Sequence, residues 1–287
     1  MPARSSVRSV LFTLVSLFTL VGSSASVHAQ VAQYRVQRPD DTACAADPGT
    51  LRWAIDSANN DGVASQVVFD AAIAGRTILL ECPLVVEASL DLFASPSVVV
   101  DGSNLAGSTI LTFGGLPSQT HNFFDLRLQG GADTQGVAIT LRHSVFLQRC
   151  QIAGNALAAA GDGAGVHLED GALILEGCRL SQNTNPGFGG AIFVDEGQLQ
   201  VRRSTIEKNQ ATLGGGGIAF ASASGSSSVV IEASTFANNQ AGQGGAIAIY
   251  GGNAANALRA VNSTFSSNGQ IGASGGAIYG EKVFGSR

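Results

Sequence analysis

The chain has 287 residues, of which 16 are basic and 21 acidic, so its formal net charge at pH 7 is −5. An acidic chain of this kind is not expected to bind nucleic acid, whose partners carry basic patches. Charged residues make up 13% of the chain and glycine occupies 37 positions, against averages of about 25% charged residues and about 7% glycine. This composition suits a fold of buried strands joined by many small turns.

The N-terminus has the pattern of a secretion signal. Arg4 and Arg8 supply a positive start, an apolar stretch runs from Val10 to Val21, and Val27-His28-Ala29 has the small-x-small form of a cleavage site. We therefore predict a signal peptide at 1–29 and export to the extracellular space or the outer-membrane surface, with the periplasm as the alternative. Because the apolar stretch is short and no second one follows, we expect no transmembrane span in the mature chain.

Residues 30–97 are predicted to form an N-terminal cap and the first irregular strands. One amphipathic helix is expected at about 50–60, where Thr50 suits the N-cap and Gly62 suits the C-terminal cap. Its apolar stripe consists of Leu51, Ala54, Ile55 and Ala58. We expect this helix to cover the open backbone edge of the first coil of a β-structure.

A repeated phrase fills the chain from Cys150 to Tyr279. It recurs roughly every 26–31 residues, a spacing typical of solenoid proteins. Each unit has a small residue, a spacer and a large apolar residue, with Asn three positions further on and a Gly-Gly-Ala-Ile phrase after it. Apolar residues alternate within the unit, which indicates strands. We therefore predict an all-β fold, a right-handed, single-stranded parallel β-helix over 98–287.

Stacking of equivalent residues predicts two inward apolar columns and one asparagine ladder. The first column is Ile152, Leu180, Ile206, Phe236 and Phe265, and the second is Val166, Ile192, Ile218, Ile247 and Ile278. The ladder is Asn155, Asn183, Asn209, Asn239 and Asn268. Its amides are expected to hydrogen-bond along the axis, with the asparagines in the left-handed turn conformation. The paired glycines are expected to have positive φ or to allow close backbone approach.

Four cysteines allow two arrangements. Cys150 and Cys178 hold the same repeat position on neighbouring coils, within reach of a disulfide. Ser204, Ser234 and Ser263 hold that position in later coils, so two stacked free thiols are the alternative. Cys44 with Cys82 follows only by elimination.

The residues from Cys44 to Tyr279 resemble a known group of proteins. Thr50-Leu51-Arg52-Trp53-Ala54-Ile55 resembles the helix of CSLREA-domain proteins, although Gly49 and Trp53 replace the motif's Cys and Glu. The Gly-Gly-Ala-Ile and Phe-x-x-Asn phrases are similar to polymorphic outer-membrane protein repeats. The resemblance implies a right-handed β-helix of the pectin-lyase-like type, exported to the cell surface or medium. Such proteins often serve as adhesins or passengers, which implies glycans or a host or neighbouring cell surface as partners.

The C-terminus stops in mid-coil at Arg287. Because terminal repeats of solenoids need a polar cap, we expect that the chain is a fragment of a longer passenger. The alternatives are a partner or end-to-end association that covers the last coil, and a defective product.

One group of acidic residues is the best candidate for chemistry. His167, Glu169 and Asp170 on one coil should lie beside Asp195 and Glu196 on the next. Paired carboxylates can share acid and base roles or bind Ca²⁺. The alternative is that these acids are polar turn ends that recur with the repeat. Zinc spacing and a Ser-His-Asp arrangement are absent from the sequence, and we expect no metal and no cofactor.

Two further groups of residues are predicted to point outward. Arg127, Arg149, Arg179 and Arg203 lie on successive coils and could bind the carboxylates of acidic sugars. Phe193, Tyr250 and Tyr279 could project outward near one another and stack on sugar rings. The sequence thus predicts an exported, adhesin-like or structural β-helix without catalysis, with a lyase or hydrolase acting on acidic glycans as the alternative.

Overall fold

The computed structural model describes residues 31–95, 97–105, 107–116, 118–133, 138–221, 227–251, 257–269 and 274–280. The chain divides into two units, Met1–Gln30 and Val31–Arg287, and every described residue belongs to the second. The predicted signal peptide and the predicted open end after residue 280 lie outside the described residues.

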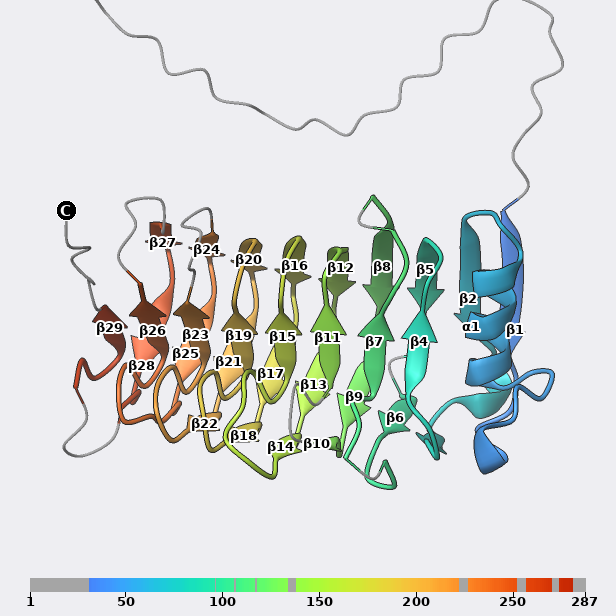
Figure 1. The fold of residues 1–287 in the computed structure, drawn as a ribbon, viewed down its shortest axis with the longest axis horizontal. Helices are drawn as coiled ribbons and strands as arrows, with labels where there is room; N and C mark the ends of the chain where they lie inside the picture. Colours follow the sequence, from blue (N-terminus) through green and yellow to red (C-terminus); the bar gives the residue numbers. More distant parts are fainter. Residues whose placement is uncertain are drawn as a thin grey trace, which may run out of the picture. The chain divides into compact units, whose positions relative to one another are not determined.

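The described unit is an all-β parallel solenoid, as the repeat predicts. Figure 1 shows the coils side by side along the long axis, from β1 and α1 in blue to β29 in red. A complete coil passes through four sheets in turn, as in β15, β16, β17 and β18. All the strand pairs are parallel, so equivalent residues of neighbouring coils lie side by side.

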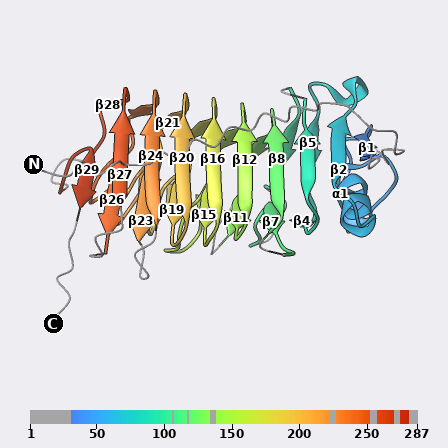
Figure 2. The same ribbon diagram turned by 90° about the horizontal axis from the view of Figure 1, so that it is seen from above.

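Sheet 1 has nine strands (Figure 2). They are β1 (Ala32–Val36), β2 (Ser65–Phe69), β5 (Leu90–Phe93), β8 (Thr120–Phe124), β12 (Ser144–Gln148), β16 (Ala172–Glu176), β20 (Gln198–Arg202), β24 (Ser228–Glu232) and β27 (Ala257–Val261). Sheet 2 has eight strands. They are β3 (Thr77–Leu79), β6 (Val99–Asp101), β9 (Arg127–Gln129), β13 (Gln151–Ala153), β17 (Arg179–Ser181), β21 (Thr205–Glu207), β25 (Thr235–Ala237) and β28 (Thr264–Ser266).

Sheet 3 also has eight strands. They are β4 (Leu84–Val86), β7 (Leu111–Phe113), β11 (Ile139–Leu141), β15 (Val166–Leu168), β19 (Ile192–Val194), β23 (Ile218–Ala221), β26 (Ile247–Tyr250) and β29 (Ile278–Gly280). Sheet 4 is a short sheet of β10 (Ala132–Asp133), β14 (Ala156–Leu157), β18 (Thr184–Asn185) and β22 (Gln210–Ala211). The helical elements are α1 (Leu51–Asn60) and two 3₁₀ turns, η1 (Thr42–Cys44) and η2 (Ala71–Ile73).

Both predicted apolar columns are confirmed. In sheet 2, Ile152 pairs in register with Leu180, and the series continues through Ile206 to Phe236 and Phe265. In sheet 3 the register aligns Val166 with Ile192, and then Ile218, Ile247 and Ile278. The core thus lies along the axis between the sheets, and each coil buries its apolar residues against the next one.

The asparagine ladder is also confirmed, and its geometry is continuous. Asn155 Nδ2 donates to Asn183 Oδ1 at 2.9 Å, and the same bond repeats to Asn209, Asn239 and Asn268 at 2.9–3.0 Å. Each Oδ1 from Asn183 onward also accepts the backbone N–H of the previous asparagine, and Asn155 Oδ1 accepts from Gly131 N. The side chains from Asn155 to Asn239 are buried, so their bonds satisfy polar groups that water cannot reach.

The asparagines do not adopt the left-handed conformation that we expected for them. The residue before each one does so instead, with φ between 53° and 66° at Gly154, Gln182, Lys208, Asn238 and Ser267. The reason is that the asparagine side chain must point inward to join the ladder. The preceding residue makes the turn with its side chain toward solvent, so its identity is free.

The paired glycines act as predicted. The first glycine of each pair has positive φ, as at Gly189 with φ 70°. The second allows close backbone approach, because a β-carbon at Gly190 would lie 2.2 Å from the carbonyl oxygen of Gly216. The repeated phrase is therefore a turn signal.

The helix α1 caps the first coils, as predicted. Thr50 Oγ1 accepts the N–H of Trp53 at 3.2 Å, and Leu51, Ala54, Ile55 and Ala58 are buried. Asn59 covers the edge of β4, since its Nδ2 donates to Val85 O at 2.8 Å and its Oδ1 accepts from Glu87 N at 2.8 Å. A further buried contact, which could not be predicted from the sequence, is the ion pair of Arg52 with Asp41 at 2.6 Å.

The structure shows the arrangement with two free thiols in the core and one disulfide near α1. Cys150 and Cys178 are buried free thiols, so the disulfide considered between them is not formed. The bond joins Cys44 to Cys82, whose Cα atoms are 5.4 Å apart. The Sγ of Cys150 donates to Phe123 O and that of Cys178 to Leu147 O, at 3.3 and 3.2 Å. Hydrogen bonding to Cys178 and burial raise the pKa of the Cys150 thiol well above its usual range.

Candidate functional site

The predicted acidic group lies at the end of two neighbouring strands of sheet 3. His167 in β15 pairs in register with Phe193 in β19, and Leu168 pairs with Val194. Glu169 and Asp195 follow these aligned residues directly, and each continues the ladder by donating its N–H to the preceding coil. The structure thus places Glu169 and Asp195 at equivalent positions of adjacent coils.

The acids of this group have separate partners. Glu169 forms an ion pair with Arg142, Asp170 accepts the N–H of Gly171 at 2.6 Å, and Glu196 accepts Ser227 Oγ at 3.3 Å. Asp195 is exposed. Within the part of the chain that the structure describes, no three His, Cys, Asp or Glu side chains form a group that could hold a metal ion. The calcium hypothesis for Glu169, Asp170, Asp195 and Glu196 stays a prediction.

The charge of a further carboxylate, Asp162, acts on His167, and the sequence did not suggest this. The Nε2 of His167 is buried and has no hydrogen-bond partner in the described structure, and its ring meets Phe193 edge-on at 5.5 Å. Burial lowers the pKa of His167, against the charges of Glu169, Asp162 and Asp195. Burial also raises the pKa of Asp162. In the sequence, the sign that Asp162 lies close to this strand is its position directly before the first glycine motif, Gly163-Ala164-Gly165-Val166.

The outward face of sheet 3 is covered from β15 onward. The segment before each glycine phrase forms its own row of parallel bridges, which joins Asp162, Phe188, Gly214, Gln243 and Ser274. A β-carbon at Gly214 would meet Ala248 and the hydroxyl of Tyr250. Because of this cover, the outward-pointing residues Phe193, Ala219 and Ala248 are buried.

The aromatic group was predicted only in part. Phe193 points outward from sheet 3, as predicted, but it is buried under the covering row and packs on His167, so it is not open to a sugar ring. Tyr250 and Tyr279 are neighbours, with ring centroids 6.0 Å apart, and Tyr250 also contacts Phe188 at 5.1 Å. The Tyr250 hydroxyl donates to Gln243 Oε1 at 2.8 Å, which ties the ring to the covering row.

A second charged surface follows the turn from sheet 1 to sheet 2, and we call it the charged corner. It consists of Asp125, Arg149, Glu176, Arg202, Arg203, Glu232 and Arg259. Its ion pairs join different coils: Asp125–Arg149 at 2.7 Å, Glu176–Arg203 at 2.6 Å, Arg202–Glu232 at 3.6 Å and Glu232–Arg259 at 3.1 Å. The four arginines predicted as one group therefore separate, because Arg149 and Arg203 belong to this corner.

The other two arginines, Arg127 and Arg179, lie in sheet 2. They are in one column with Gln151, Thr205 and then Thr235. Arg179 forms an ion pair with Glu207. The repeat predicts the coil on which each of these arginines lies. It does not predict their ion-pair partners, which depend on how the residues of neighbouring coils face one another.

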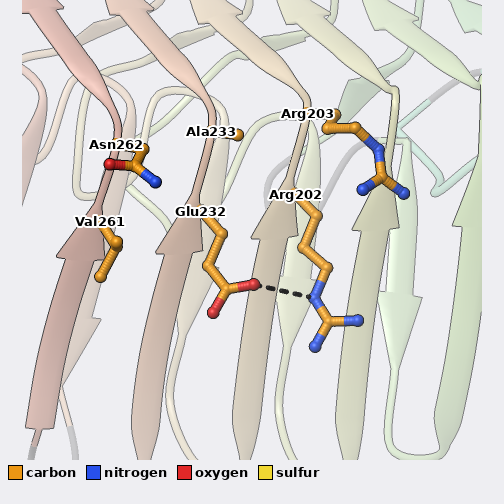
Figure 3. Close-up of a pocket in the computed structure, with 6 residues that line it drawn as sticks. All are labelled: Arg202, Arg203, Glu232, Ala233, Val261 and Asn262. Carbon is orange, nitrogen blue, oxygen red and sulfur yellow. Dashed lines mark ion pairs between the residues drawn. The ribbon is translucent and has the colours of Figure 1, made fainter.

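The charged corner contains a hollow of about 330 Å³, which we call the Ala233 hollow (Figure 3). It is lined by Arg202, Arg203, Glu232, Ala233, Val261 and Asn262. Arg203, Ala233 and Asn262 hold the same left-handed turn position on successive coils, with φ 46°, 49° and 51°. Ala233 is the small member of this row, and the hollow opens between its two longer neighbours.

A comparison with protein-family models identifies the fold family. The model for the right-handed β-helix region matches residues 117–283, more than half of the chain. The chain belongs to the right-handed β-helix family. None of the curated proteins matches it. The match confirms the predicted hand of the solenoid and supports a place in the pectin-lyase-like superfamily.

Family membership assigns no residue of this β-helix to catalysis. Sheet 3 carries a covered histidine among carboxylates, and the charged corner carries an open hollow between arginines. The helices of the described ranges are all too short or too polar to cross a lipid bilayer.

Proposed function

We propose that this protein is exported and that its β-helix serves as a non-catalytic surface that recognises glycans or a neighbouring cell. The observation that carries the proposal is that outward-facing carboxylates form ion pairs with arginines of other coils. Glu169, Glu176 and Glu207 each face an arginine of another coil. Carboxylates held in this way join coils, whereas acid–base catalysis needs a carboxyl group free to exchange a proton with substrate.

Two further features support export and surface display. The Cys44–Cys82 disulfide suits an oxidising compartment, in agreement with the signal peptide that we predict at 1–29. The resemblance to CSLREA-domain proteins and polymorphic outer-membrane protein repeats favours an adhesin-like or passenger role at the cell surface. Long solenoids suit such a role because they present extended surfaces.

The test measures binding and turnover with one preparation. The protein is recovered from the medium and from the membrane fraction, and its intact mass is determined to locate the cleavage site. It is then applied to a glycan array and to whole cells, and acidic polysaccharides are assayed for released reducing ends. We expect binding without turnover. Turnover that is lost in the Glu169→Gln, Asp195→Asn double variant would overturn the proposal.

A glycan-active enzyme is the second candidate, and one observation favours it. The charges of Glu169, Asp162 and Asp195 all act on His167, and burial shifts the pKa of His167 down and that of Asp162 up. A histidine with a lowered pKa close to an acid with a raised pKa could serve as a base and acid pair. The variant Asp162→Asn should then abolish sugar release, while Asp170→Asn on the same turn should leave it intact.

A further inference from the structure

The Ala233 hollow has an excess of positive charge. Three arginines, Arg202, Arg203 and Arg259, face two carboxylates, Glu176 and Glu232, across the charged corner. The whole chain has a net charge of −5. A local positive site on an acidic protein indicates that an anion is favoured at this place.

One donor in the hollow lacks an acceptor. The Nε of Arg202 is buried and has no hydrogen-bond partner among the described residues. The nearest carboxylate oxygen, Glu232 Oε2, is 3.6 Å away, which is too far for a hydrogen bond. Figure 3 shows Arg202 and Glu232 on adjacent strands, with their charged ends facing each other across this gap. Buried donors are nearly always satisfied. Because the Arg202 side chain as a whole is 42% exposed, its guanidinium can turn to meet an acceptor from a ligand, which would complete the site.

The other groups of the hollow restrict the ligand. Glu232 offers only acceptor oxygens, and Asn262 offers one donor group and one acceptor. A sulfate ion would bring no hydroxyl donor to Glu232, and a phosphate ion at pH 7 brings only its one or two P–OH groups, without the several ring hydroxyls that a sugar offers. A ligand with both a carboxylate and neighbouring hydroxyl groups matches the two arginines, the glutamate and the amide together. The volume of about 330 Å³ lies at the small end of ligand sites, which suits one part of a chain.

We propose that the Ala233 hollow binds a carboxylate-bearing sugar residue of an acidic glycan, and this rests on the proposed glycan recognition. Arg202 and Arg203 hold the carboxylate, while Glu232 and Asn262 bind ring hydroxyls. A guanidinium fork binds a carboxylate with two parallel hydrogen bonds, which gives both strength and orientation. The hollow is a recognition site, and no bond of the sugar is made or broken there.

The test uses two sugars that differ only in the carboxylate. Methyl glucuronide and methyl glucoside are titrated into the purified protein, and binding is followed by NMR and by calorimetry. We expect the glucuronide to bind at least about tenfold more tightly, since charge-assisted hydrogen bonds to arginine are lost with the glucoside. Inorganic phosphate at the same concentration should not compete.

Two variants place the site. Arg202→Gln removes the charge, and Ala233→Gln fills the hollow. The second should fold, because the same backbone conformation holds Arg149, Arg203 and Asn262 on other coils. Each should weaken glucuronide binding by about tenfold or more, with an unchanged unfolding midpoint. Arg179→Gln in sheet 2, whose ion pair is similarly exposed, is the matched control and should bind as the parent does.

Several outcomes would overturn the inference and leave the proposed function standing. These are equal binding of both sugars, full competition by phosphate, and unchanged binding in both hollow variants while the protein still binds cells or glycans. A different result would support the inference and overturn the proposed adhesion: the protein binds glucuronide, both variants lose this binding, and the protein does not bind cells. The hollow would then be a sugar site, and surface adhesion would fail.

Discussion

At the residue scale, the asparagine ladder holds adjacent coils in register with buried polar bonds. Asn209 shows its full pattern: it donates to Leu180 O at 3.0 Å and to Asn239 Oδ1, and it accepts from Asn183. Such a residue is worth more than one hydrogen bond, because its removal leaves several buried groups without partners.

We expect Asn209→Ala to lower the free energy of unfolding by about 2–4 kcal/mol, the cost of unsatisfied buried groups. Urea unfolding followed by circular dichroism measures this. Gln210→Ala is the control, since the Gln210 side chain is exposed on the next residue. Equal stability of the two variants would show that the ladder does not hold the coils together.

Two buried histidines are a further residue-scale feature, and the sequence suggested no role for them. His121 in β8 and His143 before β12 have ring centroids 6.0 Å apart, and none of their ring nitrogens has a partner in the described structure. Burial, with a smaller contribution from His143, lowers the pKa of His121 to about 4. Both rings are thus neutral in the folded protein at pH 7.

The low pKa of His121 predicts a loss of stability in acid. The unfolded chain binds a proton below pH about 6.5, whereas the folded chain does so only near pH 4. Stability is therefore complete above pH 6.5 and falls as the pH drops from there to 4, by about 3 kcal/mol for this group. His121→Leu should remove this part of the slope when urea unfolding is measured at several pH values. Parallel pH profiles of parent and variant would contradict the argument.

At the element scale, α1 protects the edge of sheet 3 through side chains. Asn59 supplies the donor and acceptors that the edge of β4 lacks, and Ala88 N also donates to its Oδ1 at 3.2 Å. An uncovered strand edge is a site for unwanted pairing, so this contact matters beyond its own energy.

The variant Asn59→Ala should cost about 1–3 kcal/mol, because it leaves edge groups of β4 without their partner. Hydrogen exchange of the Glu87 and Ala88 amides should speed up with it. Asn60→Ala is the matched control, since Asn60 is exposed and bonds only within its own helix. If exchange at Glu87 were unchanged, the cap would act through packing alone.

Much of the element structure could be predicted from the repeat, and the limits have a physical cause. A stacked repeat fixes which residues are equivalent, so Ile152, Asn183 and Gly189 could be placed on columns from the sequence. The residues that cover the outward side of a strand come from loops, and these loops differ in length from coil to coil. The cover over Phe193 and the partner of Glu169 therefore could not be predicted. The alanines Ala219 and Ala248, at outward strand positions, were the one available sign of that cover.

At the scale of the whole molecule, the covalent link lies at the α1 end of the solenoid. The Cys44–Cys82 disulfide joins residues 38 apart and ties the segment before α1 to the chain before β4. The two other cysteines are free and sit in the core. Their positions in later coils are held by serine, so the stack does not depend on sulfur.

Reduction of the disulfide should lower the free energy of unfolding by up to about 4 kcal/mol, from the loop entropy returned to the unfolded chain. Guanidinium unfolding with and without a reducing agent measures this. A Cys44→Ser, Cys82→Ser double variant should not respond to the reductant. Cys178→Ser should keep the full response, and loss of that response would mean that the relevant thiols are in the core.

The asparagine ladder also gives the molecule a direction. From Asn155 to Asn239, each carboxamide donates from its nitrogen to the carboxamide oxygen of the asparagine on the coil that follows. The dipoles of the carboxamide groups therefore add along the axis. A coil in the reverse orientation would place donor against donor or acceptor against acceptor, and a coil shifted by one residue would not bring its asparagine to the ladder. The ladder thus works as a template that accepts each new turn in one orientation. A gene of this kind can grow or shrink by whole repeats that carry the asparagine, while the loops between the strands can differ in length.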